Sequence, residues 1–213
     1  MREIPLENEE SYHIFNRGVD KRDIFSDAYD YFRFLRSLKE FNQIDPVVSL
    51  YILDQIRERE SIKIESLQKE KLVEIIAFNL LPNHFHLILK QVRAGGISEF
   101  MRRVGTGYTG YFNHKYKRSG VLFQGKFKAA HIDSNEKLIY LSAYVNGNHK
   151  VHRIKDGGKF SSLEEYSGGK RFLCNTEPIL SQFDSVKNYL NYVNDTAKEI
   201  GDIREDMKKC LIE

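Results

Sequence analysis

An apolar hairpin that carries two histidines is the feature that most limits how this chain can fold. Residues 75–81 form an apolar run that stops at Pro82-Asn83, two residues typical of turns, and a second apolar run begins with His84-Phe85-His86. This pattern predicts antiparallel strands over 72–80 and 84–91. Because side chains alternate along a strand, His84 and His86 should leave the same face, with Cα atoms roughly 6 to 7 Å apart.

Two imidazoles at this spacing predict a metal site. Imidazole suits Zn, Mn, Fe or Ni, and two such ligands leave positions open for a carboxylate or amide, for water and for substrate. The competing explanation is a pair of satisfied core histidines, since the chain has seven His and an HxH pair sometimes arises by chance. The position at the mouth of a hairpin favours the metal site.

The remaining elements place this hairpin in a mixed fold. Further strands are predicted at 11–17 and 121–132, and helices at 28–42, 98–117 and 135–148, with Asp27, Ser98 and Ser134 as caps. The order predicts an α+β domain with a ferredoxin-like βαββαβ antiparallel sheet, helices on one face, a C-terminal helix and a helical tail. Gly105, Gly107 and Gly110 in the middle helix indicate close approach by a partner or tight packing on the sheet.

Two segments fall outside this order. Residues 45–70 are interpreted as an insertion, with a strand at 47–53 as one option and a charged, helical stretch over 54–71. Residues 1–155 would then form the functional domain. Residues 156–213, with a helix near 184–199, would be a C-terminal extension that covers the core or the substrate groove.

Positive charge is concentrated in one part of the sequence. Residues 101–155 contain eleven Lys and Arg against two acidic residues, a local charge of +9, whereas the whole chain carries +3. Aromatic residues such as Tyr108, Phe112 and Phe123 are interleaved with these cations, a combination expected for phosphate contact and base stacking. The alternative is a solvated surface over buried aromatic rings. The cations predicted to contact nucleic acid are Arg17, Arg102, Arg103, Lys115, Lys117, Lys126 and Lys128.

The last predicted helix of the domain presents Tyr140, Tyr144 and Asn148 at i, i+4 spacing, so all three share one face. If a metal polarises a phosphodiester, either a metal-activated water or a side chain attacks it. A tyrosine on this helix is a candidate nucleophile, although a Tyr pair at helical spacing is more often part of a core.

An ordered set of short segments resembles the single-tyrosine HUH transposases, specifically the REP-associated tyrosine transposase branch. These segments are Tyr12-His13-Ile14-Phe15-Asn16-Arg17-Gly18, Leu81-Pro82-Asn83-His84-Phe85-His86-Leu87, Tyr111-Phe112-Asn113 with the stretch 118–128, and Tyr144-Val145-Asn146-Gly147-Asn148. The resemblance covers residues 11 to about 155.

The resemblance implies a role for each matching residue. His84 and His86 would bind Mg²⁺ or Mn²⁺, Asn148 would complete the metal shell, and Tyr144 would attack the phosphate to form a 5′-phosphotyrosine. Tyr140 is the fallback nucleophile. Two departures stand out: His149 follows Asn148 where related sequences often have Pro, and the insertion at 45–70 is long. Family members act as dimers that exchange tyrosine helices or as monomers, so a homodimer is one option.

The expected function is therefore a metal-dependent transposase or nickase that cleaves and rejoins single-stranded or hairpin DNA. One alternative is a non-catalytic nucleic-acid-binding protein on the same fold. Another is a metal hydrolase with HxH on a barrel strand, which needs about 250 residues and further ligands. Two distant cysteines, no secretory leader and no apolar run of membrane length lead us to expect a cytoplasmic, nucleoid-associated protein without membrane contact.

Overall fold

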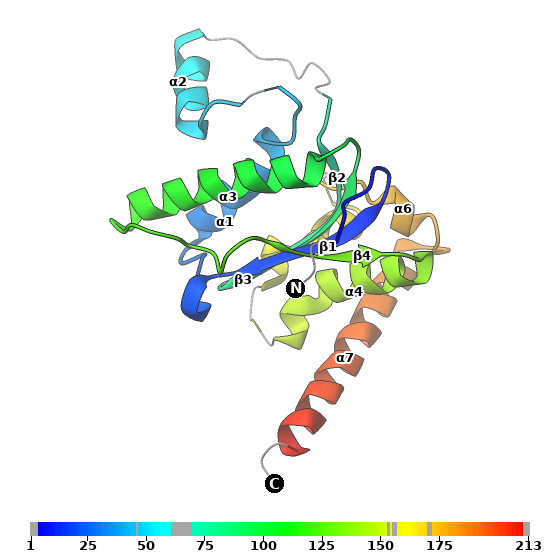
Figure 1. Cartoon of the computed structure of the whole chain (residues 1–213). Coiled ribbons are helices and arrows are strands. Elements are labelled where there is room, and N and C mark those ends of the chain that lie inside the picture. Colours follow the sequence, from blue (N-terminus) through cyan, green and yellow to red (C-terminus); the bar gives the residue numbers. More distant parts are fainter. Residues whose placement is uncertain are drawn as a thin grey trace.

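The computed structural model places a four-stranded antiparallel sheet between two layers of helices (Figure 1). It describes residues 4–45, 47–60, 70–152, 154, 157–169 and 172–210. The strands are β1 (Ser11–Arg17), β2 (Val73–Leu81), β3 (His84–Gln91) and β4 (Lys128–Ile132). They lie in the order β2-β3-β1-β4, and each neighbouring pair is antiparallel. The predicted α+β antiparallel sheet is confirmed.

Helices connect and follow these strands. They are η1 (Val19–Lys21), α1 (Ala28–Glu40), α2 (Leu50–Glu60), α3 (Gly96–Lys115), α4 (Asn135–Val151), η2 (Gly157–Phe160), α5 (Leu163–Tyr166), α6 (Glu177–Leu180) and α7 (Val186–Cys210). None of the helices in the described part of the chain is long and apolar enough to cross a membrane.

One face of the sheet packs against α1 and α3, which lie side by side in Figure 1. Alternate strand residues supply this face, among them Ile14 of β1 and Leu87 of β3, which are opposite each other and fully buried. They join Phe34 of α1 and Phe100 of α3 in the larger of two apolar clusters. Burial of such side chains stabilises the fold by roughly 1.5 to 3 kcal/mol each.

The other face packs against α4, and α7 packs on α4 in turn (Figure 1). Ile76 and Ile88 of the sheet, Val145 of α4 and Val193 of α7 belong to the second apolar cluster. The C-terminal segment therefore extends this core rather than standing apart from it. The division into a domain over residues 1–155 and a C-terminal extension over 156–213 stays a prediction.

Two predicted helix starts are confirmed in detail. Asp27 caps α1 with a reciprocal arrangement, in which its carboxylate accepts from the backbone N–H of Asp30 and the Asp30 carboxylate accepts from the N–H of Asp27. Ser134 caps α4 by accepting from the backbone N–H of Lys137.

Several predicted boundaries are wrong. Helix α3 starts at Gly96, after Gly95 at φ 72°, and not at a Ser98 cap. Position 96 requires glycine, because a Cβ there would lie 2.2 Å from the Leu72 carbonyl oxygen. The predicted strand 121–132 shrinks to β4, since Gly120 and Gly125 adopt positive φ and interrupt extended pairing.

The insertion and the end of α4 also differ from prediction. The strand option at 47–53 is wrong, because α2 begins at Leu50, which is fully buried. An ion pair between Arg36 of α1 and Asp54 fixes α2 beside α1. The rest of the predicted helix, 61–69, lies outside the described residues. Helix α4 continues past Asn148 to Val151, because His149 lacks the ring that makes Pro a helix breaker.

Candidate active site

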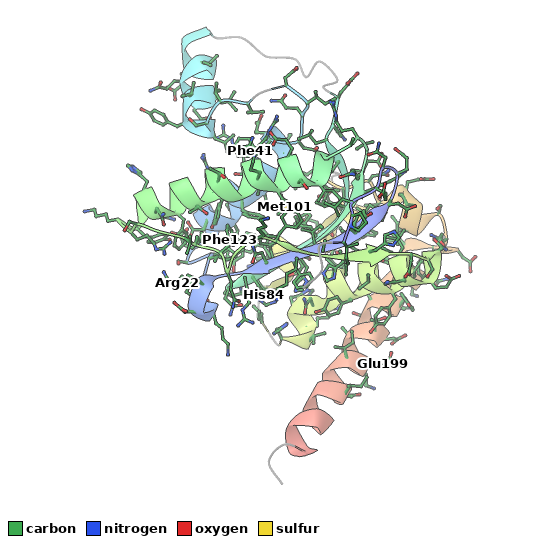
Figure 2. All side chains as sticks on the ribbon, viewed as in Figure 1. Arg22, Phe41, His84, Met101, Phe123 and Glu199 are labelled. Atoms are coloured by element: carbon green, nitrogen blue, oxygen red, sulfur yellow. The ribbon has the colours of Figure 1, made fainter. Side chains whose placement is uncertain are left out.

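His84 and His86 project from β3 toward α4, on the sheet face opposite α3. In the strand register His86 pairs with Phe15 of β1 and Asn79 of β2, and His84 pairs with Arg17 and Leu81. Directly opposed residues share a face of the sheet. Figure 2 shows His84 on the side of the sheet away from Met101 of α3. The prediction that the two imidazoles leave one face is confirmed.

Helix α4 aligns Tyr144 and His152 over this pair. The Tyr144 ring stands edge-on to His86, with ring centroids 5.6 Å apart, and its centroid is 6.2 Å from that of His13 on β1. Two turns further along, His152 at the end of α4 lies 5.4 Å from His84, centroid to centroid. The helix face that contains Tyr144, Asn148 and His152 therefore lies against the two histidines.

Asn148 lies between these two contacts, and its side-chain amide is buried. Its side chain is fully buried, and neither Oδ1 nor Nδ2 has a hydrogen-bond partner among the described residues. An unpaired buried polar group costs about 1 to 3 kcal/mol. A cation beside His84 and His86 would satisfy the amide oxygen, so the residues present fit a divalent metal with two nitrogen ligands and one oxygen ligand. The described residues contain no group of three or more His, Cys, Asp or Glu that could hold a metal, so such a site would depend on the amide.

A second buried amide attaches α4 to the sheet next to the pair. Asn79 of β2, opposite His86, donates from Nδ2 to the backbone oxygen of Val145 at 2.8 Å. Its Oδ1 has no partner among the described residues. This bond sets the depth of α4 on the sheet and hence the position of Tyr144, one residue before Val145.

His86 has a close polar neighbour that sequence reasoning did not identify as part of the site. Its Nδ1 lies 2.8 Å from Nε2 of His13, which projects from β1 and is only 9% exposed. Burial lowers the pKa of His13 to about 4, so its ring is neutral at neutral pH.

Asn83, in the turn before β3, makes the matching contact with His84. Its Oδ1 lies 2.6 Å from Nδ1 of His84, and its Nδ2 donates to the backbone oxygen of Lys21. Because a backbone carbonyl only accepts, the second bond fixes the amide with its oxygen toward His84. His84 Nδ1 is therefore the donor.

Tyr140, the fallback nucleophile, lies in a different environment. It is 42% exposed, and burial together with the negative charge of Glu199 on α7 raises the pKa of its hydroxyl. A raised pKa disfavours the phenolate that attack requires. Of the two tyrosines, Tyr144 is the better placed candidate, because its ring lies against His86.

The predicted nucleic-acid contacts divide into two groups. Arg17 and Lys128 lie on the sheet face of the histidines, since Arg17 is opposite His84, and Lys128 is opposite Phe15, itself opposite His86. Lys126 is exposed in the loop that precedes β4. This loop is bound to β1, because Gln124 N–H donates to the backbone oxygen of Arg17 at 2.8 Å.

The cations of α3 belong to the helix on the opposite face, and three of them are paired within the fold. Arg102 and Arg103 both bind the carboxylate of Glu99, and these hydrogen bonds lower the pKa of Glu99 to about 2. Arg103 also donates to the backbone oxygens of residues 43–45. Lys117 follows the helix and is exposed. A DNA role for these α3 residues stays a prediction.

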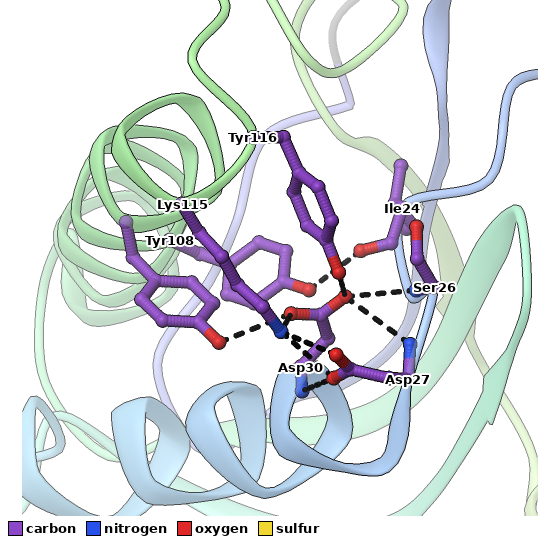
Figure 3. Close-up of polar contacts among 8 residues, drawn as sticks. Ile24, Ser26, Asp27, Asp30, Tyr108, Lys115 and Tyr116 are labelled. Atoms are coloured by element: carbon purple, nitrogen blue, oxygen red, sulfur yellow. Dashed lines mark hydrogen bonds and ion pairs between the residues drawn. The ribbon is translucent and has the colours of Figure 1, made fainter.

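Lys115 is part of a polar cluster between α1 and α3, built around the buried carboxylate of Asp30 (Figure 3). Its ammonium binds Asp27 and Asp30 at 2.7 Å each, and Tyr111 and Tyr116 donate their hydroxyls to Asp30, which is fully buried. Burial alone would lower the pKa of Lys115, but these bonds outweigh it and raise the pKa. Lys115 thus compensates a buried carboxylate.

Comparison with known proteins agrees with this geometry. Residues 50–148 match the family model "Transposase IS200 like". The matched segment is just under half of the chain, and over that segment the chain is similar to the IS200-like transposases. The match includes β2, β3, α3, β4 and most of α4, and so contains His84, His86, Tyr144 and Asn148.

A solved structure shares the fold of this chain. It is described as a REP-associated tyrosine transposase bound to a REP hairpin, and the two chains superpose with a TM-score of 0.53 at 13% sequence identity. The alignment covers 79% of this chain and 85% of the other. No curated protein sequence matches the chain significantly.

Proposed function

We propose that this chain is an IS200-like transposase that cleaves and rejoins single-stranded DNA, beside a hairpin, through a 5′-phosphotyrosine intermediate. The observation that carries the proposal is the position of Tyr144, whose ring stands edge-on to His86 with centroids 5.6 Å apart. The same helix carries the buried amide of Asn148, which is unpaired among the described residues. A hydroxyl nucleophile, two imidazoles and an amide oxygen are thereby gathered on one face of the sheet. The hairpin is inferred from the similar solved structure, which is described with a REP hairpin.

The chemistry conserves phosphodiester bonds. Tyr144 Oη attacks phosphorus, the bond from phosphorus to the 3′ oxygen breaks, and that oxygen leaves as a 3′-hydroxyl after taking a proton. The DNA 5′ end stays joined to Tyr144. Attack by a 3′-hydroxyl reverses the step, frees Tyr144 and reseals a strand, so no ATP is consumed.

His84, His86 and Asn148 are the residues that would hold the metal, with Mg²⁺ or Mn²⁺ as the proposed cofactor. When bound, a divalent cation would supply positive charge at the scissile phosphate. Arg17 and Lys128 flank the histidines on the same sheet face, where they would hold the DNA backbone and orient the phosphate toward Tyr144. Lys126 would extend this contact along the exposed loop.

The test is the formation of a DNA-linked peptide. Purified protein is incubated with labelled hairpin-bearing single-stranded DNA and Mn²⁺, then analysed by denaturing gel and peptide mass spectrometry. We expect an adduct on Tyr144 that is lost in Tyr144→Phe and on addition of chelator. Tyr140→Phe is the matched control, because it removes a hydroxyl one helical turn away, and it should retain the adduct.

Two results would contradict the proposal. An adduct that moves to Tyr140, or persists in Tyr144→Phe, would assign the nucleophile elsewhere. DNA binding in native gels with no adduct on any tyrosine, across a broad set of hairpins, would instead identify a non-catalytic nucleic-acid-binding protein.

A further inference from the structure

The short contact between His13 and His86 determines which nitrogen of His86 can bind a metal. The contact joins Nε2 of His13 to Nδ1 of His86 at 2.8 Å. One of these two nitrogens therefore carries a proton and donates, and the other accepts the hydrogen bond through its lone pair. If His13 donates, a neutral His86 must hold its own proton on Nε2. If His86 donates from Nδ1, its Nε2 keeps a lone pair.

A metal ligand needs that lone pair. Since Nδ1 of His86 is already bonded to His13, Nε2 is the remaining ring nitrogen through which His86 could bind a cation. Metal-binding histidines generally use their second N–H to bond a neighbouring group, and this bond fixes both the tautomer and the ring orientation. His13 occupies the place of that neighbouring group.

His84 is likewise held through its Nδ1. Its Nδ1 donates to Asn83 Oδ1 at 2.6 Å, and Asn83 is oriented by its bond to the Lys21 carbonyl. Both histidines of the pair thus have Nδ1 bonded to a side chain from outside the pair.

We propose that His13 and Asn83 are positioning residues that hold His86 and His84 in the Nδ1–H tautomer, with both Nε2 atoms directed at one cation. His13 accepts from His86, and its own proton is on Nδ1. The inference rests on the proposed function, because that function requires a cation at this pair. It goes further by assigning work to two residues that touch neither substrate nor metal.

The packing around His13 supports a fixed role. Its ring lies 5.1 Å from that of Phe15 and 6.2 Å from that of Tyr144, centroid to centroid, and it is opposite Ala130 in the strand register. Neighbours on β1, β4 and α4 therefore surround the imidazole that accepts from His86. The hydrogen bond would be weaker at an exposed histidine, because water competes for the same atoms and screens the interaction.

The first experiment uses the unmodified protein and does not depend on activity. Nitrogen-15 NMR of histidine side chains, in metal-free protein at neutral pH, reports which ring nitrogen carries the proton. We expect His84 and His86 with the proton on Nδ1. A His86 signal with the proton on Nε2 would overturn the proposal, even if every variant failed to fold.

The second experiment measures Mn²⁺ affinity by calorimetry in the absence of DNA. His13→Phe keeps an aromatic ring but removes the acceptor, and we expect affinity to fall roughly 10- to 100-fold. His131→Phe is the matched control, because His131 lies on the other sheet face next to Tyr12 and pairs with Glu10 at the surface. It should bind Mn²⁺ like the unmodified protein. Asn83→Ala makes the corresponding test for His84.

The outcomes separate this inference from the proposed function. Equal Mn²⁺ affinity in folded His13→Phe and unmodified protein overturns the positioning role, whereas the Tyr144 adduct can still form. Loss of the adduct in a protein with both Nδ1–H tautomers and normal Mn²⁺ binding overturns the proposed function alone. Absence of Mn²⁺ binding in the unmodified protein overturns both.

Discussion

Replacing the three glycines of α3 by alanine, one at a time, should give opposite effects on stability. Alanine is favoured over glycine inside a helix by about 1 kcal/mol. A Cβ added at Gly105 or Gly110 meets no atom within 4 Å, so these two variants should gain most of that amount. A Cβ added at Gly107 would lie 2.7 Å from Cε2 and 3.1 Å from Cζ of Phe41, a buried ring at the end of α1.

At Gly107 the clash opposes the helix propensity. Real Cβ atoms do not approach within 3.0 Å of another atom, so the Phe41 ring must shift, and overpacking of this kind costs roughly 1 to 3 kcal/mol. We therefore expect Gly107→Ala to be roughly 1 to 3 kcal/mol less stable than Gly105→Ala. Urea denaturation measures the difference directly, provided that the m-value, the slope of unfolding free energy against urea concentration, is the same in both variants. If Gly107→Ala were stabilised as much as Gly105→Ala, the packing argument would be refuted.

A double-mutant cycle identifies the cause of the effect. In a Phe41→Leu background the clash is relieved, so Gly107→Ala should cost less than it does alone. Equal costs in both backgrounds would assign the effect to the helix backbone. The same variants also address whether a partner approaches α3 closely. A loss of hairpin affinity in Gly105→Ala or Gly110→Ala, in spite of increased stability, would show that DNA lies against these glycines.

Further predictions concern stability and DNA binding. Burial holds the pKa of His13 at about 4 against 6.5 for the free group, so between these values the unfolded chain binds a proton that the folded chain does not. The stability of the metal-free protein should therefore fall as pH decreases from about 6.5 to 4, by up to roughly 3 kcal/mol from this group. In His13→Phe, the unfolding free energy from urea titrations should depend less steeply on pH over this range. Lys115→Met leaves the Asp30 carboxylate buried without a cation and should cost roughly 3 to 5 kcal/mol in urea denaturation, with partial recovery on adding Asp30→Asn. Arg102→Ala removes an exposed ion pair that solvent screens, and it should leave stability essentially unchanged. Lys128→Ala should leave the melting temperature unchanged. The slope of log DNA affinity against log salt concentration should become shallower by about 1, and an unchanged slope would exclude a phosphate contact.

Local sequence rules were sufficient for the parts of the site that lie within one element. The period of two along β3 places His84 and His86 on one face, and the period of 3.6 along α4 places Tyr144 and Asn148 on another. Both patterns depend only on neighbours in the sequence.

Residues that act across elements could not be identified in this way. His13 belongs to the site only because β1 pairs with β3 in a register that sets Phe15 opposite His86, and sequence period gives no register between distant strands. Lys115 was expected at a DNA surface because it lies in a basic segment. It compensates Asp30, 85 residues away, because α1 and α3 pack side by side. His152 was not predicted either. It lies close to His84 because α4 continues about one turn beyond the predicted end at Asn148.

The position of Tyr144 depends on the segment after residue 155 as well as on the sheet. Asn146, two residues after Tyr144, donates to the Tyr189 hydroxyl of α7 and accepts from the Ser162 hydroxyl, and all three side chains are buried. At the next residue, Gly147, a Cβ would lie 3.1 Å from Ala197 of α7, so only a glycine lets the two helices approach this closely without a shift. On its other side α4 is attached to β2 by the bond from Asn79. A nucleophile must be held within about 0.5 Å of its productive position, and here the helix that carries it is held between the sheet and the tail. The C-terminal segment is therefore part of what positions the candidate catalytic residue, although no residue from it was predicted to belong to the site.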